Sequence, residues 1–236
     1  MGLIDVHSHL LPGLDDGCEN IEDSIACARV LVEYGYTHSF CTPHIWPNLP
    51  ANSVKKIPQY VDALQAVLDR EQIPLKLIPG GEINIHPTLT QTPPEEIVTC
   101  AMARKYALVD LWADRLPEYF FDAVRWLQDL GLTVILAHPE RMRAIQDEPE
   151  AADVLAEKGV LLQGNLQCLS DPLGKDTRRV IEKFLAEGRY FLLGSDLHKL
   201  ATLPSRIAGL KRAREVLGEE GIAKLMVENP KKLMGE

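Results

Sequence analysis

The chain has 236 residues, of which 46% are hydrophobic and 25% are charged, an ordinary composition for a globular protein. This length suits one α/β barrel, or at most two small domains. Lys and Arg total 25 against 34 Asp and Glu, and the net charge of −9 argues against a protein that coats nucleic acid, because a phosphate backbone needs a positive field.

Short apolar runs alternate with longer amphipathic stretches along the chain, which favours a parallel α/β fold. Strands are predicted near Leu3–Val6, Thr37–Cys41, Leu75–Pro79, Ala107–Leu111, Thr133–Ala137, Val160–Gln163 and Tyr190–Gly194. Helices are predicted over Ile21–Tyr34, Val54–Arg70, Pro117–Leu130, Pro149–Lys158, Asp176–Glu187 and Pro204–Leu217, with a last helical turn at Gly221–Val227. Seven strand–helix units predict a closed or nearly closed barrel, and an open doubly wound sheet is the alternative. Without a visible linker or repeat, residues 1–236 are expected to form a single domain.

The cysteines and the N-terminal residues predict a soluble cytosolic protein. The odd number of cysteines and the lack of a CxxC pair fit free thiols in a reducing compartment. The five are Cys18, Cys27, Cys41, Cys100 and Cys168. The first residues show no basic and apolar signal-peptide pattern, and no apolar run reaches the ~18 residues of a membrane span.

The unusual polar residues cluster by position, because nearly all of them follow the apolar run of a predicted strand. They are His7, His9, Asp15, Asp16, His44, Glu82, Asp110, His138, Asp196 and His198. In a barrel the carboxyl ends of the strands line one mouth, so these side chains are expected to converge there.

Two of these segments repeat one arrangement. In the extended segments His7-Ser8-His9 and Asp196-Leu197-His198, residues two apart project to the same face and can reach a common point. Single members have simpler interpretations: Asp15-Asp16-Gly17 could be a turn, and a lone His is as often a capping or packing residue. Their convergence favours a metal centre.

The predicted ligands are imidazole and carboxylate groups without a thiolate, a mixture that suits Mn, Fe or Zn, and they exceed what one ion requires. Glu82 could bridge two ions, which would lower the pKa of a shared water and clamp both ends of an in-line displacement. Arg141 and Arg206 follow ligand segments and could hold a phosphate by bidentate hydrogen bonds, although Arg206 could equally be a surface residue of a helix. Cations in such a pocket would make a phosphate substrate compatible with an acidic protein.

Other hydrolytic and nucleotide-binding mechanisms lack their motifs. A cysteine phosphatase needs an Arg six positions after its Cys, and none of the five cysteines has one. The chain also lacks GxxxxGK[ST], GxGxxG and GxSxG.

Several motifs resemble one known family. Ile4–His9 followed by Pro12–Gly17 resembles the opening of the PHP (polymerase and histidinol phosphatase) superfamily, and more narrowly the capsule-associated bacterial protein-tyrosine phosphatases of the CpsB/YwqE type. The similarity continues through Thr42–His44, Gly80–Ile83, His138–Arg141, Gly194–His198 and Glu228–Pro230, and so spans essentially the whole chain.

The resemblance implies a distorted seven-stranded β/α barrel of the TIM-like PHP type, with a trinuclear centre that usually prefers manganese. By motif, one metal would be held by His7, His9, Glu82 and Asp196, a second by Glu82, Asp110 and His138, and a third by Asp16, His44 and His198. Arg141 and Arg206 match the phosphate-binding arginines. The implied substrate is phosphotyrosine on the tail of a bacterial tyrosine kinase that controls exopolysaccharide synthesis.

Two departures from the family pattern bear on the site. The family commonly has Glu where this chain has Asp110, which is one methylene shorter. Relatives also often carry a second His where Ile45-Trp46-Pro47 follows His44. Both departures affect the expected metal occupancy and substrate preference.

The predicted reaction is in-line attack on phosphorus by a metal-bridging hydroxide, with His44 or a metal-bound water as the candidate general acid. Histidinol phosphate or another small phosphomonoester is the main alternative substrate. An exonuclease-type activity is disfavoured by the negative net charge. A second class of hypothesis, motivated by Asp110, is a regulatory protein that binds metal or a kinase tail without catalysis.

Overall fold

The chain alternates between strands and helices, and its paired strands run parallel. The computed structural model describes residues 2–170 and 173–235. The strands there are β1 (Leu3–Ser8), β2 (Tyr36–Cys41), β3 (His44–Ile45), β4 (Lys76–Pro79), β5 (Glu82–Asn84), β6 (Tyr106–Asp110), β7 (Thr133–Ala137), β8 (Leu161–Asn165) and β9 (Leu192–Gly194). The predicted α/β class is confirmed.

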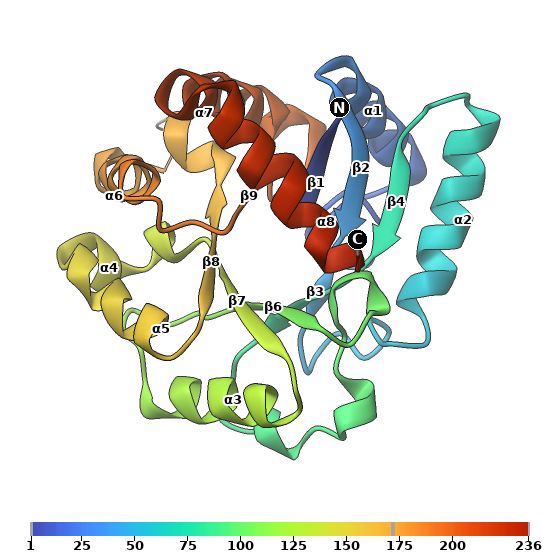
Figure 1. Cartoon of the computed structure of the whole chain (residues 1–236). Coiled ribbons are helices and arrows are strands. Elements are labelled where there is room, and N and C mark those ends of the chain that lie inside the picture. Colours follow the sequence, from blue (N-terminus) through green and yellow to red (C-terminus); the bar gives the residue numbers. More distant parts are fainter. Residues whose placement is uncertain (1, 171–172, 236) are drawn as a thin grey trace.

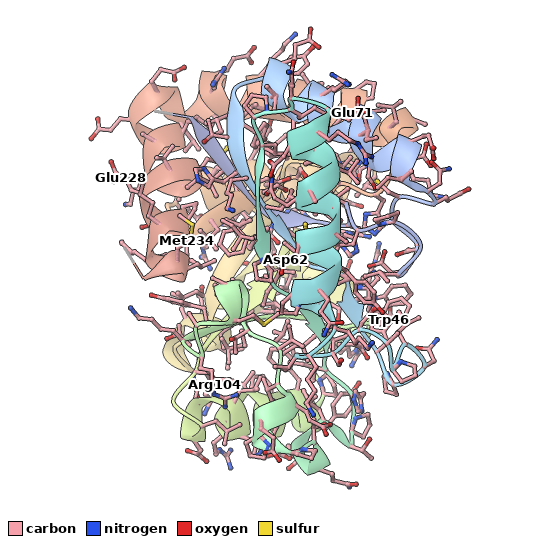
Figure 2. All side chains as sticks on the ribbon, turned by 90° about the vertical axis from the view of Figure 1, so that its right-hand side faces the viewer. Trp46, Asp62, Glu71, Arg104, Glu228 and Met234 are labelled. Carbon is pink, nitrogen blue, oxygen red and sulfur yellow. The ribbon has the colours of Figure 1, made fainter. Side chains whose placement is uncertain are left out.

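Except for the last helix, the helices lie around the outside of the strands (Figure 1). They are α1 (Ile21–Glu33), α2 (Ile57–Arg70), α3 (Glu118–Asp129), α4 (Arg143–Asp147), α5 (Asp153–Glu157), α6 (Lys175–Ala186), α7 (Leu203–Ala223) and α8 (Asn229–Met234). Helix α2 packs along β4, with Asp62 on the helix and Glu71 directly after its end (Figure 2). Within the described residues, no helix is long and apolar enough to cross a membrane.

Four helical segments differ from the prediction. The stretch expected as one helix over Pro149–Lys158 is a 3-10 turn at Pro149–Ala152 followed by α5. The short helices α4 and α8 were not predicted. Helix α7 continues past Leu217, but its helical geometry is interrupted at Gly218, where φ is 66°. Only glycine adopts that conformation readily, which explains why the helical pattern ends there.

The strands are divided between two sheets, with orders β1-β2-β4 and β3-β5-β6-β7-β8-β9. Thr42 and Pro43 separate β2 from β3, and Gly80 and Gly81 separate β4 from β5. A proline lacks the N–H that a parallel ladder needs, and glycine weakens a strand interior. The described residues thus form nine strands in two sheets, and the expected count of seven strands is not confirmed.

The outer strands β1 and β9 are linked at their carboxyl ends. Ser8 and Leu197 form a parallel bridge. The Asp196 N–H donates to the His7 carbonyl at 2.8 Å, and the His9 N–H donates to the Leu197 carbonyl at 2.7 Å. These bonds bring the His-Ser-His and Asp-Leu-His segments side by side.

An inner apolar cluster supports the strands of both sheets from one side. It is formed by Ile4, Val6, Phe40, Ile78, Cys100, Leu108, Ile135, Ala137, Leu192 and Leu233. Leu233 belongs to α8, which lies across β1 and β2 in Figure 1. A larger cluster fills the space between the strands and the outer helices. The polar strand ends are therefore fixed on a rigid, close-packed base.

Candidate metal centre

The structure brings the nine residues predicted as metal ligands together at the carboxyl ends of the strands. Three groups of their ligand atoms each lie within 4.8 Å of one another. The groups are His9–Asp16–His44–His198, His7–His9–Glu82 and His44–Glu82–Asp110. Because His9, His44 and Glu82 each belong to two groups, the three form one continuous cluster.

The two remaining predicted ligands contact this cluster directly. Asp196 Oδ1 lies 3.5 Å from His7 Nε2 and 3.4 Å from His9 Nε2. His138 Nε2 lies 2.9 Å from Glu82 Oε1. Asp110 shares its group with His44, whereas the sequence resemblance paired it with His138.

Glu82 is the centre of the cluster and is fully buried. Its Oε2 atom lies 3.4 Å from His7 Nε2, 3.6 Å from His9 Nε2 and 2.8 Å from His44 Nδ1. One carboxylate thus faces four imidazole rings, since its other oxygen faces His138. This is the placement expected of a bridging ligand.

Two buried atoms at this centre lack a hydrogen-bond partner within the described part of the chain: Glu82 Oε2 and His44 Nδ1. The two atoms lie 2.8 Å apart. The Nε2 atoms of His7 and His9 also approach to 3.3 Å. Unpartnered buried polar atoms cost about 1–3 kcal/mol each, and convergent lone pairs suit a cation. The donor set therefore fits divalent metal ions.

Three imidazoles are oriented by a bond to the ring nitrogen that faces away from the cluster. His7 Nδ1 donates to Gln163 Oε1 at 2.8 Å, and His9 Nδ1 donates to Asp15 Oδ2 at 2.8 Å. His198 Nδ1 donates to the Asp196 carbonyl at 2.9 Å. Each bond leaves Nε2 as the acceptor that faces the centre, the usual device for fixing a metal-binding histidine.

Sequence reasoning missed the positioning role of Gln163 and left Asp15 as part of a turn. A signal for Gln163 was present, because it lies at the end of a predicted strand, the position that ligands occupy on other strands. Asn165 was missed too. It ends β8, and its side-chain amide donates to Asp196 Oδ2 at 2.8 Å.

The backbone is strained at two predicted ligands. His138 has φ 37° and Asp196 has φ 50°, in the left-handed region that non-glycine residues rarely adopt. His138 directly follows β7, and Asp196 lies two residues after the end of β9. Such strain persists only where the surrounding structure enforces it, and it clusters at functional sites.

Asp110 is held by two donors. Its Oδ1 accepts from the Asn84 amide at 3.1 Å, and its Oδ2 accepts from the Trp112 indole N–H at 2.5 Å. Burial and the nearby Glu82 raise the pKa of Asp110 to about 6. The shorter side chain still places an oxygen within the His44–Glu82 group.

The other central carboxyl groups are ionised although they are buried. Burial acts to raise the pKa of Glu82, but His7, His138 and His44 together hold that pKa well below its usual range. Burial likewise opposes the charge on Asp196, whose pKa is held well below its usual range by His7 and His9. Both carboxylates are therefore available as charged ligand groups for a cation.

The two predicted phosphate-binding arginines differ in exposure. The Arg141 side chain is 41% exposed and donates through Nη1 to Asp196 Oδ2 at 2.9 Å. Arg206 is buried. Its Nε donates to the Ser195 carbonyl at 2.9 Å, and its Nη1 donates to the Thr202 carbonyl at 3.0 Å. A further bond joins its Nη2 to the Asp196 carbonyl. Arg141 thus lies at the mouth, whereas Arg206 supports the segment that carries Asp196.

Parallel strands with a His/Asp/Glu cluster at their carboxyl ends define an α/β protein with a candidate metal centre of hydrolytic type. A family model described as capsular polysaccharide synthesis, CpsB/CapC, matches residues 3–235. The chain belongs to this CpsB/CapC family, and the resemblance seen in the sequence motifs is confirmed.

Similar proteins are named as tyrosine phosphatases. The chain is 31% identical over 200 residues to tyrosine-protein phosphatase YwqE of Bacillus subtilis, covering 85% of this chain and 79% of that protein. It is 24% identical over 242 residues to tyrosine-protein phosphatase CpsB of Streptococcus pneumoniae, covering 98% of each. It is also 24% identical over 214 residues to the putative tyrosine-protein phosphatase CapC of Staphylococcus aureus, covering 91% of this chain and 84% of that protein.

Solved structures are similar over nearly the whole chain. One is described as YwqE from Bacillus subtilis and CpsB from Streptococcus pneumoniae, unique metal-dependent tyrosine phosphatases. It superposes with a TM-score of 0.83 at 30% identity and covers 99% of this chain and 92% of that one. A probable 2-pyrone-4,6-dicarboxylic acid hydrolase from Acinetobacter baumannii has a TM-score of 0.61 at 14% identity over 100% of each chain, a likeness of fold alone.

Proposed function

We propose that this protein is a cytoplasmic metal-dependent protein-tyrosine phosphatase that acts on the phosphotyrosine tail of a bacterial tyrosine kinase in capsule or exopolysaccharide regulation. The observation that carries the proposal is the continuous His/Asp/Glu cluster around Glu82, in which Glu82 Oε2 and His44 Nδ1 are buried without a hydrogen-bond partner among the described residues. The family and the named relatives support the substrate class.

The proposed metal ligands are the nine residues of the sequence prediction. They are His7, His9, Asp16, His44, Glu82, Asp110, His138, Asp196 and His198. Manganese is the metal we expect, with iron or zinc as alternatives, because the donors are imidazole and carboxylate groups. Two or three divalent ions bound there would neutralise phosphate charge and lower the pKa of a bound water.

The residues of the chain would bind and orient the phosphoester. Arg141 contacts Asp196 through Nη1, and its partly exposed guanidinium can offer further N–H groups to a phosphate in a bidentate arrangement. The phenolate of tyrosine, with an ordinary pKa of about 10, is a better leaving group than an alkoxide. A general-acid role of His44 remains a prediction.

We assign Arg206 a positioning role in this mechanism. Its bonds to the Ser195 and Asp196 carbonyls fix the strained backbone that presents Asp196 to the cluster. Direct phosphate binding by Arg206 remains a prediction from sequence, and its burial makes Arg141 the better candidate.

For the architecture, we propose a single domain over residues 1–236 folded as a distorted seven-stranded barrel. Counting β2 with β3 and β4 with β5 as interrupted strands gives seven, since only two residues separate each pair. The bonds between the ends of β1 and β9 support the neighbouring placement that closure requires.

Phosphate release tests the proposal. With manganese added, the protein should hydrolyse a phosphotyrosine peptide faster than histidinol phosphate, and His7→Ala should abolish the reaction. Preference for histidinol phosphate would retain the mechanism and overturn the substrate. A protein with confirmed metal content that releases phosphate from neither compound would contradict catalysis and favour a metal-binding regulatory role.

A further inference from the structure

One large aromatic side chain stands exposed beside the candidate metal centre. Trp112 is 70% exposed, although its indole N–H donates to Asp110 Oδ2 at 2.5 Å. This bond fixes the direction of the ring, because Asp110 is itself buried and also held by Asn84. An exposed tryptophan alone is unremarkable, but one anchored to a buried carboxylate of the cluster presents its rings at a defined place.

A second tryptophan joins this ring to the cluster. Trp46 stacks on the His44 imidazole with ring centres 4.2 Å apart and an interplanar angle of 21°. Trp112 meets Trp46 edge to face, at 5.2 Å and 83°. The aromatic surface therefore runs without a break from His44 through Trp46 to the exposed Trp112.

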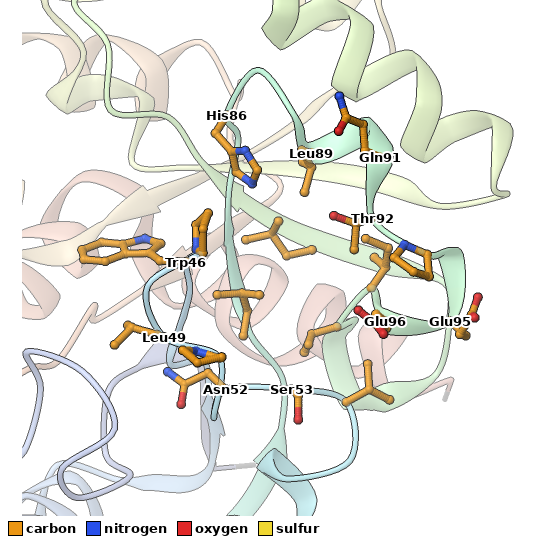
Figure 3. Close-up of a pocket in the computed structure, with 18 of the residues that line it drawn as sticks. Trp46, Leu49, Asn52, Ser53, His86, Leu89, Gln91, Thr92, Glu95 and Glu96 are labelled. Atoms are coloured by element: carbon orange, nitrogen blue, oxygen red, sulfur yellow. The ribbon is translucent and has the colours of Figure 1, made fainter.

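The surroundings of Trp46 leave room for a bound group. Trp46 lies at one end of a cavity of about 860 Å³, which Figure 3 shows bordered by His86, Leu89 and Leu49. Its buried indole N–H has no hydrogen-bond partner among residues 2–170 and 173–235. A buried donor without an acceptor costs free energy.

We propose that Trp46 and Trp112 form an aromatic wall that packs against the phenyl ring of the substrate and selects aryl over alkyl phosphoesters. The inference rests on the proposed function and names residues that determine its substrate class. A ring that packs edge to face or offset on this wall gains apolar burial and the aromatic pair interaction. The short side chain of a phosphoserine has no ring to place there.

Trp112 also positions Asp110 through its hydrogen bond, and this effect can be separated from contact with the substrate. Trp112→Ala removes both the ring and this N–H, whereas Trp112→Phe keeps an aromatic ring and removes only the N–H. Tyr34→Ala is the matched control, because Tyr34 is a partly exposed aromatic residue just after α1 and outside the cluster.

The test compares kcat/KM for two peptides that differ only in carrying phosphotyrosine or phosphoserine. The ratio of the two values cancels the intrinsic reactivity of the leaving groups when variants are compared. Trp112→Ala and Trp46→Ala should each lower the ratio by about tenfold, corresponding to about 1.4 kcal/mol. Trp112→Phe should lower kcat/KM for both peptides but keep most of their ratio. Tyr34→Ala should change neither the kcat/KM values nor the ratio.

Binding of non-hydrolysable phosphonates gives a second readout. With manganese added, calorimetry should show tighter binding of phenylphosphonate than of butylphosphonate, and Trp112→Ala should remove this preference. The proposed role of the aromatic wall would be contradicted if Trp112→Ala kept both the preference for phenylphosphonate and the kcat/KM ratio of the two peptides. This variant must have the native melting temperature and metal content. If the wild-type protein hydrolyses neither peptide, the proposed function fails, and the phosphonate comparison still decides the inference.

Discussion

Gln163 on β8 accepts a hydrogen bond from Nδ1 of His7 on β1, with 2.8 Å between the two atoms. The two strands are not paired with each other, so this bond spans the interior of the site. Because the amide oxygen can only accept, it fixes the proton of His7 on Nδ1 and leaves Nε2 to face Glu82 and Asp196. A residue outside the ligand set thus controls the tautomer of a ligand.

Replacing Gln163 should therefore weaken metal binding while the ligands remain in place. Gln163→Leu removes the acceptor of the His7 proton, and we expect the affinity for manganese to fall by about 10–100-fold. Competition with a fluorescent chelator measures the change. Gln59→Leu, at an exposed position of α2, is the control. Unchanged affinity in Gln163→Leu would show that this bond does not prepare His7 for a metal.

Substitution of Arg141 should reduce activity, whereas substitution of Arg206 should reduce stability. Arg141→Ala should lower kcat/KM for a phosphotyrosine peptide by about 100-fold, the cost of removing one charged donor from a reacting phosphoryl group, and leave the melting temperature nearly unchanged. Arg206→Met should instead destabilise the fold by about 2–4 kcal/mol, because it leaves buried carbonyls unpaired. Urea unfolding and steady-state kinetics on both variants check this division, and equal stability loss in the two would contradict it.

Metal binding should raise the thermal stability of the protein. A ligand at 100 times its Kd stabilises the folded state by about 2.7 kcal/mol, which is about 5–10 °C in Tm for a domain of this size. Scanning fluorimetry with manganese and then with excess EDTA measures the shift. Glu82→Ala should abolish the manganese-dependent part, since Glu82 belongs to two of the three ligand groups. A Tm that does not change when manganese is added would contradict the metal centre.

Behind the mouth, Tyr190 and Glu140 form a buried support. The Tyr190 hydroxyl donates to Glu140 Oε2 at 2.8 Å, and Glu140 Oε1 accepts from the Asn165 N–H at 2.7 Å. Tyr190→Phe removes the hydroxyl without changing the ring, and we expect a loss of about 1–2 kcal/mol in the free energy of unfolding. Chemical denaturation measures it, with Tyr34→Phe as the control at a partly exposed position. Equal stability of the two variants would show that the bond contributes nothing.

The sequence indicated where the strands lie but not where they are interrupted. All seven predicted strands overlap observed ones, because alternation of apolar runs reports burial directly. The two-residue breaks at Thr42–Pro43 and Gly80–Gly81 depend on tertiary placement: a Cβ on Gly81 would lie 2.7 Å from Val98 and 2.8 Å from Ile45. Such packing leaves no periodic signal in the sequence.

Within the candidate site, the sequence singled out residues that follow strands, which the structure brings together, and it did not single out the residues that orient them. His7, His9 and Asp196 carry chemistry that is unusual for a loop, so their type and position identified them. Gln163 and Asn165 are ordinary polar residues whose role comes from one bond each across the site. The exposure of Trp112 likewise depends on the fold, because a tryptophan in an apolar stretch is more often buried.

The most direct test of the account is an anomalous difference map at the manganese edge from crystals grown with manganese. We expect two or three peaks inside the cluster, at least two of them within coordinating distance of the Glu82 carboxylate, and none there in crystals of Glu82→Ala. A map with no peak near Glu82 in fully occupied wild-type crystals would contradict the metal centre on which the proposed phosphatase depends.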